Sequence, residues 1–313
     1  MFAKKKYLRI LAEKNEIFGS IPEELMTADK IDEIRQIPHV AIGDVRNGNQ
    51  LLAVLKVLNE KKPDAFLPVL TYTGTEHGDV VAFGKYLDLI KTAIEKTLKI
   101  YVLDPVIVGA PSFFRALNTS HSAEIKNKFG FFSPCLGCRF YALAVMVPLC
   151  KKVNARTIIT GELITDNEEY NFRVVENFTY CSKLMKGFGI DLWDGTITEE
   201  NKADVLNNLK IKKLPDDIFY LSCAINSKCM AETVSIGLLE NVKKYYEDFA
   251  IPAAAKVLSR VFSGREFCMI FWAMYRAIFI AERKSYGGSP VTETAIEGTE
   301  YMVPSMAAET VPE

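Results

Sequence analysis

The sequence predicts an α/β protein built on a doubly wound parallel sheet, followed by an all-helical C-terminal region. Four short apolar runs, "HVAIG", "AFLPVLTY", "IYVLDPVIV" and "ARTIIT", are rich in Val, Ile and Tyr and too short for helices. Helix-like segments such as "NQLLAVLKVLNEK" and "RFYALAVMVPLCKKV" lie between them. The apolar runs do not alternate strictly with polar residues, which is typical of parallel strands buried on both faces.

The segments around this domain give its boundaries. In residues 1–37, "LRILAEKNEIF" spaces its apolar residues as a helix does, and "SIPEELMTADKIDEI" begins with Ser-x-Pro and an acidic first turn, which favour a helix start. We expect an N-terminal helical extension there and the α/β domain at residues 38–214. A cysteine-containing segment and further helices follow at residues 215–284. Residues 285–313 carry Gly, Pro, Thr and Glu without periodicity and are predicted to be disordered.

Composition and charge exclude several classes of partner. The 313 residues are 49% hydrophobic and 25% charged, with a formal net charge of −1. A general nucleic-acid coat or a polybasic membrane anchor would need an excess of Lys and Arg. The start "MFAKKKYLRILAEKNE" has no apolar core followed by a small-residue cleavage site, so it is not a secretory signal. We expect a cytoplasmic protein with no membrane partner, and a local basic groove stays compatible with this charge.

One apolar run, "FCMIFWAMYRAIFI" at residues 267–280, is not predicted to span a membrane. It is shorter than the roughly 20 apolar residues that a bilayer requires, and it contains Arg276. A buried helix or an oligomer contact fits better. This run therefore favours a homodimer formed through the C-terminal helices.

A Cys-x-x-Cys pair, Cys135 and Cys138, stands directly ahead of a helix-like segment. A two-residue gap lets both sulfurs face one metal ion from a tight turn, which Gly137 would ease. The same spacing suits a redox pair, because either thiolate can be activated by its neighbour. The structural alternative is two small residues near a helix start. Seven cysteines in a chain without a secretory signal favour metal or redox chemistry over a disulfide.

Two further cysteines, Cys223 and Cys229 in "CAINSKC", give a weaker signal. They could complete a four-thiolate zinc site with the first pair, or supply ligands to an iron–sulfur cluster. The gap between them is five residues, and "IFYLSCAI" also reads as a strand with one buried cysteine. Spacing alone does not separate zinc from an iron–sulfur cluster.

The run "ARTIITGELI" predicts a buried strand that ends in Thr160, Gly161 and Glu162. This end offers a hydroxyl, an unhindered backbone and a carboxylate at the edge of the sheet where α/β folds bind ligands. A glycine there lets a nucleotide approach the chain closely. A strand followed by an ordinary turn is the more common meaning of an isolated Thr-Gly-Glu.

The segment "HVAIGDVRNGNQLLAVLKVL" places a glycine-containing loop between a strand and a helix. Backbone N–H groups at a helix start attract anions, so the loop is placed to hold phosphate, with a guanidinium group as an added contact. An ordinary loop with Asn49 as the helix cap is an equal alternative. The candidate cofactor-binding residues here are Gly43, Asp44, Arg46, Asn47, Gly48 and Asn49.

Taken together, these residues resemble the PP-loop ATP-pyrophosphatase superfamily, particularly its tRNA-thiolating and other sulfur-inserting members. The matching order is a strand with a loop entering a helix, two more strands, Pro-Cys-x-x-Cys, a helix, and a strand ending in Thr-Gly-Glu. The segment "VENFTYCSKLMKGFGIDL", with Asn177, also resembles the family. The resemblance covers residues 38–229 and implies an adenine-nucleotide alpha-hydrolase-like fold. The helical end has no counterpart.

One motif departs from the family pattern. The pyrophosphate loop of the family reads Ser-Gly-Gly-x-Asp-Ser, whereas this chain has "VRNGNQ" in the corresponding place. The serines and the aspartate are missing. Either the triphosphate binds differently, through Arg46 and the backbone of residues 47–49, or the fold has been kept without ATP hydrolysis.

The resemblance implies a two-stage reaction that uses ATP and Mg²⁺. ATP activates a carbonyl oxygen of an acceptor as an adenylate, and a sulfur nucleophile then displaces AMP. The acceptor would be a nucleotide, a tRNA or a small cofactor precursor, with a donor protein as one possible source of sulfur. Cys135 and Cys138 would handle sulfur or bind metal. The alternatives are a degenerate PP-loop protein that binds a nucleotide or partner around structural zinc, and a cluster-dependent sulfur lyase or reductase without ATP.

Overall fold

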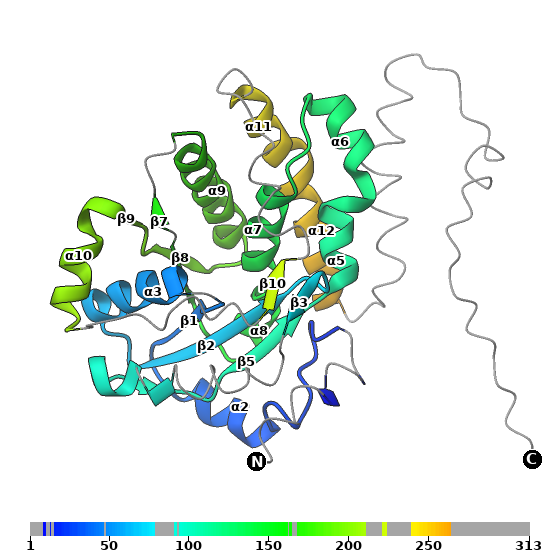
Figure 1. Ribbon diagram of the computed structural model, residues 1–313. Helices are drawn as coiled ribbons and strands as arrows, with labels where there is room; N and C mark the ends of the chain where they lie inside the picture. Colours follow the sequence, from blue (N-terminus) through cyan, green and yellow to red (C-terminus); the bar gives the residue numbers. More distant parts are fainter. Residues whose placement is uncertain are drawn as a thin grey trace, which may run out of the picture. The chain divides into compact units, whose positions relative to one another are not determined.

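The computed structural model shows an α/β fold around a parallel sheet (Figure 1). All described residues belong to one compact unit that spans Met1–Ile270. The apolar run at 267–280 and the predicted tail at 285–313 lie outside the described part of the chain. The structure describes residues 9–10, 13, 16–46, 48–78, 91–92, 94–161, 163–164, 168–210, 221–223 and 239–263.

The central sheet has six strands that all pair in parallel, as the apolar runs predict. Every residue of the two strands from "HVAIG" and "AFLPVLTY" is buried, so both faces of the sheet are covered there. The strands are β1 (Val40–Asp44), β2 (Ala65–Tyr72), β4 (Tyr101–Val102), β5 (Val106–Gly109), β6 (Thr157–Thr160) and β8 (Asp191–Asp194).

The order of the strands reverses once. From β1 the chain moves to β2, and then to β4 and β5, which pair along the same far side of β2. It then returns to the other side of β1, where β6 pairs with β1 and β8 pairs with β6. The reversal lies between β1 and β6. Open parallel sheets form a crevice at this point, outside the carboxyl ends of the strands.

Two small sheets lie beside the main one. β3 (Glu76–Gly78) pairs antiparallel with β10 (Leu221–Cys223). β7 (Leu163–Ile164) pairs in parallel with β9 (Ile197–Thr198), so the chain segments that follow β6 and β8 stay adjacent beyond the main sheet.

The helices follow the predicted interleaving. α3 packs against β1, β6 and β8, whereas α7 packs against α9, and α12 packs against α5, α8 and α9. The helices are α2 (Ala28–Arg35), α3 (Gly48–Lys61), α5 (Pro111–Leu117), the 3₁₀ turn η1 (Thr119–His121), α6 (Ser122–Phe129), α7 (Pro134–Ala144), α8 (Val147–Lys152), α9 (Glu168–Gly187), α10 (Glu199–Asn208), α11 (Leu239–Tyr245), the π-helical η4 (Tyr246–Ala250) and α12 (Ile251–Phe262).

Two predicted elements are each divided in the structure. "IYVLDPVIV" forms β4 and β5 instead of one strand, with Pro105 in the gap, because proline cannot donate to the strand ladder. "RFYALAVMVPLCKKV" forms the end of α7 and then α8, with Pro148 near the start of the second helix. Proline fits the first turn of a helix but removes a hydrogen bond from its interior.

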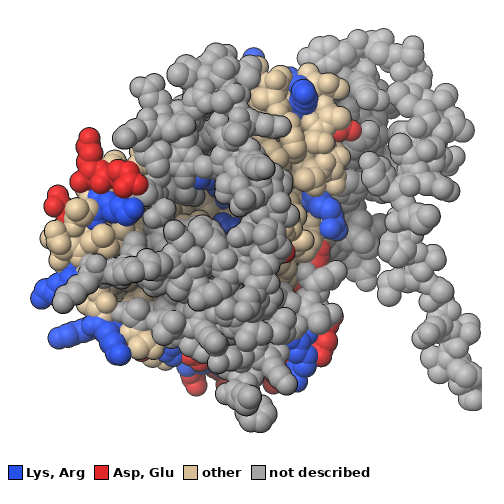
Figure 2. Space-filling view, in the orientation of Figure 1, with Lys and Arg blue, Asp and Glu red and all other residues tan. Residues whose placement is uncertain are grey.

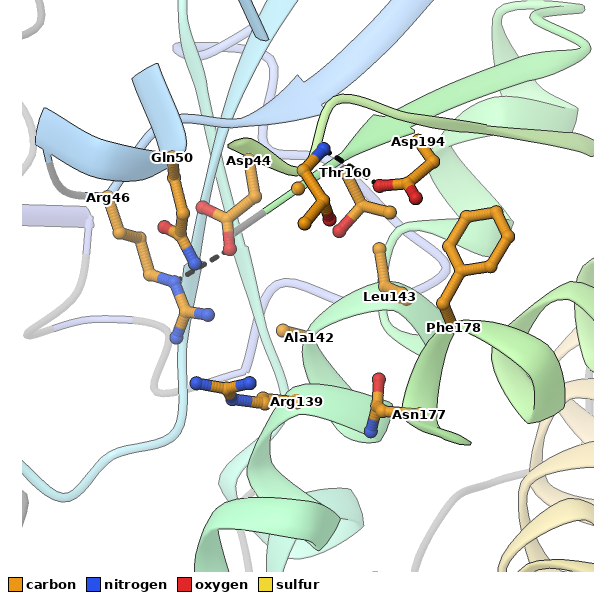
Figure 3. A pocket seen from close by; sticks show the side chains of 12 residues that line it. Asp44, Arg46, Gln50, Arg139, Ala142, Leu143, Thr160, Asn177, Phe178 and Asp194 are labelled. Carbon is orange, nitrogen blue, oxygen red and sulfur yellow. Dashed lines mark hydrogen bonds and ion pairs between the residues drawn. The ribbon is translucent and has the colours of Figure 1, made fainter. Parts of the chain in front are cut away.

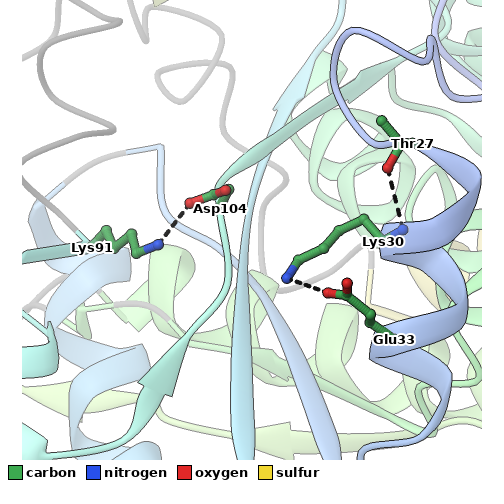
Figure 4. A network of polar contacts seen from close by, with 5 residues as sticks. All are labelled: Thr27, Lys30, Glu33, Lys91 and Asp104. Atoms are coloured by element: carbon green, nitrogen blue, oxygen red, sulfur yellow. Dashed lines mark hydrogen bonds and ion pairs between the residues drawn. The ribbon is translucent and has the colours of Figure 1, made fainter.

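The N-terminal extension contributes the helix α2, which begins at Ala28 and not at the predicted Ser-x-Pro. The side chain of Thr27 caps this helix by accepting a hydrogen bond of 3.2 Å from the backbone N–H of Lys30. Figure 4 shows this cap and the ion pair between Lys30 and Glu33. A second ion pair, between Lys91 and Asp104, joins the segment before β4 to the loop between β4 and β5.

Two further observations bear on the predicted partners. Figure 2 shows basic and acidic side chains interspersed on one face, with acidic groups gathered over the start of α10. Among the described helices, the segment Pro134–Lys152, which contains α7 and α8, is long and apolar enough to cross a membrane. Because 78% of its most apolar window is buried inside the fold, it has the character of a core segment.

Candidate functional site

Three polar side chains lie at one level across the carboxyl ends of β1, β6 and β8. Gly43 pairs with Ile159, so the next residues along these parallel strands, Asp44 and Thr160, stand side by side. Thr160 pairs in turn with Asp194. The strand order reverses between the first two of these strands. The predicted Thr160 is therefore placed at the ligand-binding edge of the sheet, together with an aspartate from each neighbouring strand.

These strand ends line an open cleft (Figure 3). The space inside it, including the part open to solvent, is about 550 Å³. α7 and α9 form the opposite wall and supply both charged and apolar side chains. The lining residues are Asp44, Arg46, Gln50, Arg139, Ala142, Leu143, Thr160, Gly161, Asn177, Phe178, Asp194 and Thr196.

Asp44 is the most buried charged group of the cleft, with 8% of its surface exposed. Its Oδ2 accepts a hydrogen bond of 2.9 Å from Thr71 and lies 2.6 Å from Nε of Arg46. Its Oδ1 has no hydrogen-bond partner among the described residues. Burial raises the pKa of Asp44, and the charge of Arg46 and the hydrogen bond from Thr71 offset only part of this effect.

The end of the cleft next to β1 carries two guanidinium groups, and we call it the β1 end. Arg46 follows β1, and Arg139 extends from α7 toward the same side of the cleft (Figure 3). Gln50, in the first turn of α3, adds an amide. Among the described lining residues, one carboxylate, Asp44, faces these two guanidinium groups, so these residues together carry a positive charge suited to an anion.

The opposite end, next to β8, has a different character, and we call it the β8 end. Asp194 lies there with Thr196, and α7 and α9 contribute Leu143 and the half-buried Phe178 (Figure 3). Oδ1 of Asp194 accepts a hydrogen bond of 2.8 Å from the backbone N–H of Thr196. This end combines one carboxylate with an apolar, aromatic wall.

Gly161, predicted to let a nucleotide approach, serves helix and loop packing. A Cβ atom at this position would lie 2.7 Å from the Cβ of Ala53 in α3 and 2.6 Å from the backbone of Gly195. Gly195 is equally constrained, because its Cβ would lie 2.3 Å from the carbonyl oxygen of Ala53. Both glycines allow α3 to approach the loops that follow β6 and β8, which forms the floor of the cleft.

The predicted phosphate loop is shorter than the sequence suggests. Gly43 lies inside β1, where a Cβ would press against the ring of Phe66 at 3.0 Å, so it serves packing and not a turn. Gly48 begins α3, which places Asn49 inside the first turn and not at the cap. Asn47 lies outside the described residues. Asp44 ends β1, and Arg46 is the loop residue that the structure brings into the cleft.

The predicted Cys-x-x-Cys turn is helical. Cys135 and Cys138 are the second and fifth residues of α7, and both are half-buried and form no disulfide with a described residue. Gly137 does not form a turn: a Cβ there would lie 2.7 Å from the side chain of Asn118. Residues three and four apart share a helix face, so the two cysteines lie one turn before Arg139 and Ala142 on the side that faces the cleft. They are not among the residues that line it.

The remaining predicted residues are not joined to this site by the structure. Cys223 ends β10, where it pairs with Glu76 of β3, and its side chain is not described. Cys229 and Glu162 lie outside the described residues. In the described part of the chain, no group of three His, Cys, Asp or Glu side chains is placed to hold a metal ion.

Sequence reasoning missed most of the wall of the cleft. Arg139 stands four residues after Cys135, and this helical spacing was the available signal. Asp194 follows "DLW" and precedes a glycine, which is typical of a strand end, but only strand pairing shows that this end adjoins Thr160. Phe178 had no signal at all, because one aromatic residue in a helix usually belongs to the core.

Comparison with known proteins adds a relative but no function. No family model matches the chain. A stretch of 159 residues is 27% identical to "Uncharacterized protein MJ0009" of Methanocaldococcus jannaschii. The match covers 50% of this chain and 57% of that protein, so the chain spans little more than half the length of this relative. The name of the relative assigns no activity.

Proposed function

We propose that the protein is an ATP-dependent enzyme of the PP-loop type, which adenylates an acceptor and then transfers sulfur to it. The proposed fold is the doubly wound, adenine-nucleotide alpha-hydrolase-like sheet, continued by a helical C-terminal region. The observation that carries the proposal is the position of the cleft. It lies at the point where the strand order reverses, and its β1 end has a surplus of positive charge.

The β1 end is suited to the phosphates of a nucleotide. Arg46 and Arg139 offer guanidinium groups, which bind phosphate oxygens with charge-assisted hydrogen bonds. α3 begins at Gly48, directly after this loop, and a helix N-terminus attracts negative charge. These groups replace the serines and the aspartate of the family loop. They would also stabilise the charge that develops as pyrophosphate leaves.

In the proposed reaction, the cysteines of α7 supply the sulfur nucleophile. Cys135 and Cys138 are the second and fifth residues of the helix, near its N-terminus. Arg139, one residue further, lines the cleft itself. A persulfide sulfur on either cysteine, received from a donor protein, would attack the activated carbon. AMP would then leave with the acceptor's former carbonyl oxygen, and the acceptor would be joined to that cysteine through a disulfide. The thiolate of the other cysteine would attack this disulfide, which releases the thiolated acceptor and leaves a disulfide between Cys135 and Cys138 that an external dithiol reductant reduces before the next cycle.

A metal site would need more residues than these two cysteines. Zinc in a structural site takes four ligands, and an iron–sulfur cluster is usually held by four thiolates. Among the described residues, no third His, Cys, Asp or Glu side chain is grouped with Cys135 and Cys138 to hold a metal ion. No step of the proposed reaction uses zinc or an iron–sulfur cluster, and such a site completed by Cys223 and Cys229 remains a separate prediction.

A second candidate function is nucleotide binding without adenylation. The observation that favours it is the ion pair between Asp44 and Arg46, because a guanidinium already paired with a carboxylate binds phosphate less strongly. The loop also lacks the serines and the aspartate of the catalytic family. In this case the thiols would hold a structural metal ion, or a cluster with its own lyase or reductase chemistry.

Arg139→Gln tests the proposed phosphate site, with Arg156→Gln as the matched control. Arg139 lines the cleft, whereas Arg156 is exposed and lies outside it. Loss of one charge-assisted contact is expected to weaken ATP binding about tenfold or more, measured by titration calorimetry, because such a contact contributes about 1.5–3 kcal/mol. The control should bind as the unchanged protein does.

Two outcomes would contradict the proposal. If the unchanged protein does not bind ATP with Mg²⁺, the nucleotide site is wrong. If it binds ATP but releases no pyrophosphate with tRNA, nucleosides or nucleotides as acceptors, the second candidate replaces the first. Metal analysis of the unchanged protein and of Cys135→Ala, together with an absorption spectrum of anaerobically purified protein, decides between zinc, a cluster and free thiols.

A further inference from the structure

We infer that the β8 end of the cleft binds the nucleobase of the acceptor, with the face of the base against Phe178 and its amino group donating to the carboxylate of Asp194. This inference deepens the proposed function by naming a substrate class. It rests on the proposed function only in treating the bound molecule as the acceptor of the reaction. The binding of a base at this end can be measured whether or not the protein uses ATP.

The first step of the argument is the separation of the two ends. β6 lies between β1 and β8, so the ends of the outer strands are two strand spacings apart, about 10 Å. Arg46 and Arg139 belong to one end, and Phe178 and Asp194 belong to the other (Figure 3). A phosphate held by the two arginines therefore leaves the β8 end for a different chemical group.

The second step is the orientation of Asp194. Its Oδ1 is fixed by the backbone N–H of Thr196 at 2.8 Å. The loop around it is fixed as well, because the backbone N–H of Gly195 donates to the carbonyl of Thr160 at 2.7 Å, and Lys56 donates to the carbonyl of Thr196 at 3.0 Å. Oδ2 has no hydrogen-bond partner among the described residues. Asp194 is exposed, so this oxygen is open to solvent and to a ligand in the cleft, and a carboxylate oxygen accepts a hydrogen bond from a ligand that is a donor.

The third step is the aromatic wall. Phe178 is half-buried on α9, lines the cleft, and has no ring contact with another aromatic residue in the described part of the chain. Leu143 and Ala142 of α7 continue the same apolar surface. An aromatic ring that lines a cleft offers a stacking face, and every nucleobase has a planar face that can use it.

Together these features select one ligand class. A phosphate is disfavoured because the carboxylate of Asp194 repels it, and an aliphatic group leaves the carboxylate unused. A planar ring with an amino group uses both, since carboxylates accept hydrogen bonds from the amino group of cytosine. A base that carries a carbonyl oxygen in place of this amino group would set one hydrogen-bond acceptor against another, the carboxylate of Asp194. Such a base is therefore disfavoured.

Cytidine and uridine provide the sharpest test, because they have nearly the same shape and differ along one edge. Cytidine carries an amino group at C4 beside an acceptor at N3, whereas uridine carries a carbonyl at C4 beside an N–H at N3. We expect cytidine to bind at least about fivefold more tightly than uridine. Binding is measured by ligand-observed NMR titration, with and without a saturating non-hydrolysable ATP analogue. An oligoribonucleotide UUCUU measured beside free cytidine separates the two sources of such a base: tighter binding assigns it to RNA, and equal binding to a free nucleoside or nucleotide.

Two variants separate the carboxylate from the aromatic ring. Asp194→Asn should reduce the preference for cytidine to near unity, because an amide presents both a donor and an acceptor. Asp191→Asn, an exposed aspartate on the same strand but outside the cleft, is the matched control and should keep the preference. Phe178→Leu should weaken the binding of both nucleosides about tenfold, since each loses the stacking contact. The ratio of cytidine affinity to uridine affinity should stay unchanged.

Equal binding of cytidine and uridine to the unchanged protein would overturn the inference. So would an Asp194→Asn variant that keeps the preference. If Phe178→Leu weakens the binding of the ATP analogue as strongly as it weakens nucleoside binding, the base at this end is that of ATP and not that of the acceptor. If the unchanged protein does not bind ATP, the proposed function is refuted, whereas the measured preference for cytidine still supports a base site at this end.

Discussion

Two buried polar groups near the carboxyl edge of the sheet differ in how completely they are satisfied. The hydroxyl of Tyr141 accepts a hydrogen bond of 2.6 Å from the backbone N–H of Ala110 and donates one of 2.7 Å to the carbonyl of Tyr72. The carboxylate of Asp44 has two partners on Oδ2, whereas its Oδ1 has no hydrogen-bond partner in the described part of the chain.

The difference separates a structural role from a binding role. Tyr141 is fully buried and joins α7 to the ends of β2 and β5, so its hydrogen bonds hold the helix against the sheet. Asp44 lines the cleft and faces Arg46 and the space beyond it. A buried polar group with complete hydrogen bonding stabilises the fold, whereas an incompletely bonded one beside a cavity is available to a ligand.

The largest effect is expected for Tyr141→Phe. This change removes the hydroxyl and leaves the N–H of Ala110 and the carbonyl of Tyr72 buried without their partner. Each lost partner costs about 1–2 kcal/mol, so the free energy of unfolding should fall by about 2–4 kcal/mol. Urea denaturation measures it. ATP affinity below the unfolding transition should be unchanged, and a selective loss of ATP binding would contradict the structural role.

A smaller effect is expected for Gly161→Ala. The added methyl group would meet Ala53 and the backbone of Gly195 at 2.6–2.7 Å, which should lower the free energy of unfolding by about 1–3 kcal/mol. Gly187→Ala is the matched control, because nothing lies within 4 Å of a Cβ there. That change should be neutral or slightly stabilising in a helix. If Gly161→Ala unfolds with the same free energy as the unchanged protein but no longer binds nucleotide, Gly161 serves ligand binding and not packing.

The smallest effect is expected for Asp44→Asn, which should tighten ATP binding roughly threefold to tenfold. Removing one negative charge from beside a bound phosphate is worth about 1 kcal/mol in a partly solvated site. Calorimetric titration of both proteins under matched salt measures the ratio. Weaker binding in the variant would show that the carboxylate assists the nucleotide instead of competing with it.

Asp44→Asn should also change how the free energy of unfolding depends on pH. Burial raises the pKa of Asp44 in the folded protein, so the folded state holds this proton more tightly than the unfolded state does. The stability that this group contributes is complete below its unfolded pKa and is lost as pH rises through its folded pKa. The unfolding free energy of the unchanged protein should therefore fall relative to that of Asp44→Asn over this range.

Local sequence signals accounted for much of the fold. The predicted strands from "HVAIG", "AFLPVLTY" and "ARTIIT" are confirmed, as is their parallel pairing. Burial on both faces requires continuous apolar runs, and these are visible without any knowledge of the neighbouring strands. The divisions at Pro105 and before Pro148 were also readable in principle, since proline interrupts both a strand ladder and a helix interior.

The candidate site was recovered in part. Asp44, Arg46 and Thr160 line the cleft, because residues at the carboxyl ends of parallel strands meet at one edge. The predicted turn at Cys135 and Cys138 was wrong, since the spacing of two thiols fits the first turn of a helix as well as a tight loop. Phe178 and Asp194 had to come from the structure.

The sequence by itself determined which segments form strands and helices, because periodicity and proline positions act over a few residues. Only the tertiary structure decided which side chains share the cleft. The reversal of strand order sets β6 beside β1, and the pairing register then brings Asp194 level with Thr160 and Asp44. Asp44 and Thr160 are 116 positions apart along the chain and Thr160 and Asp194 are 34 apart, and such pairings depend on how whole elements pack and not on their local composition.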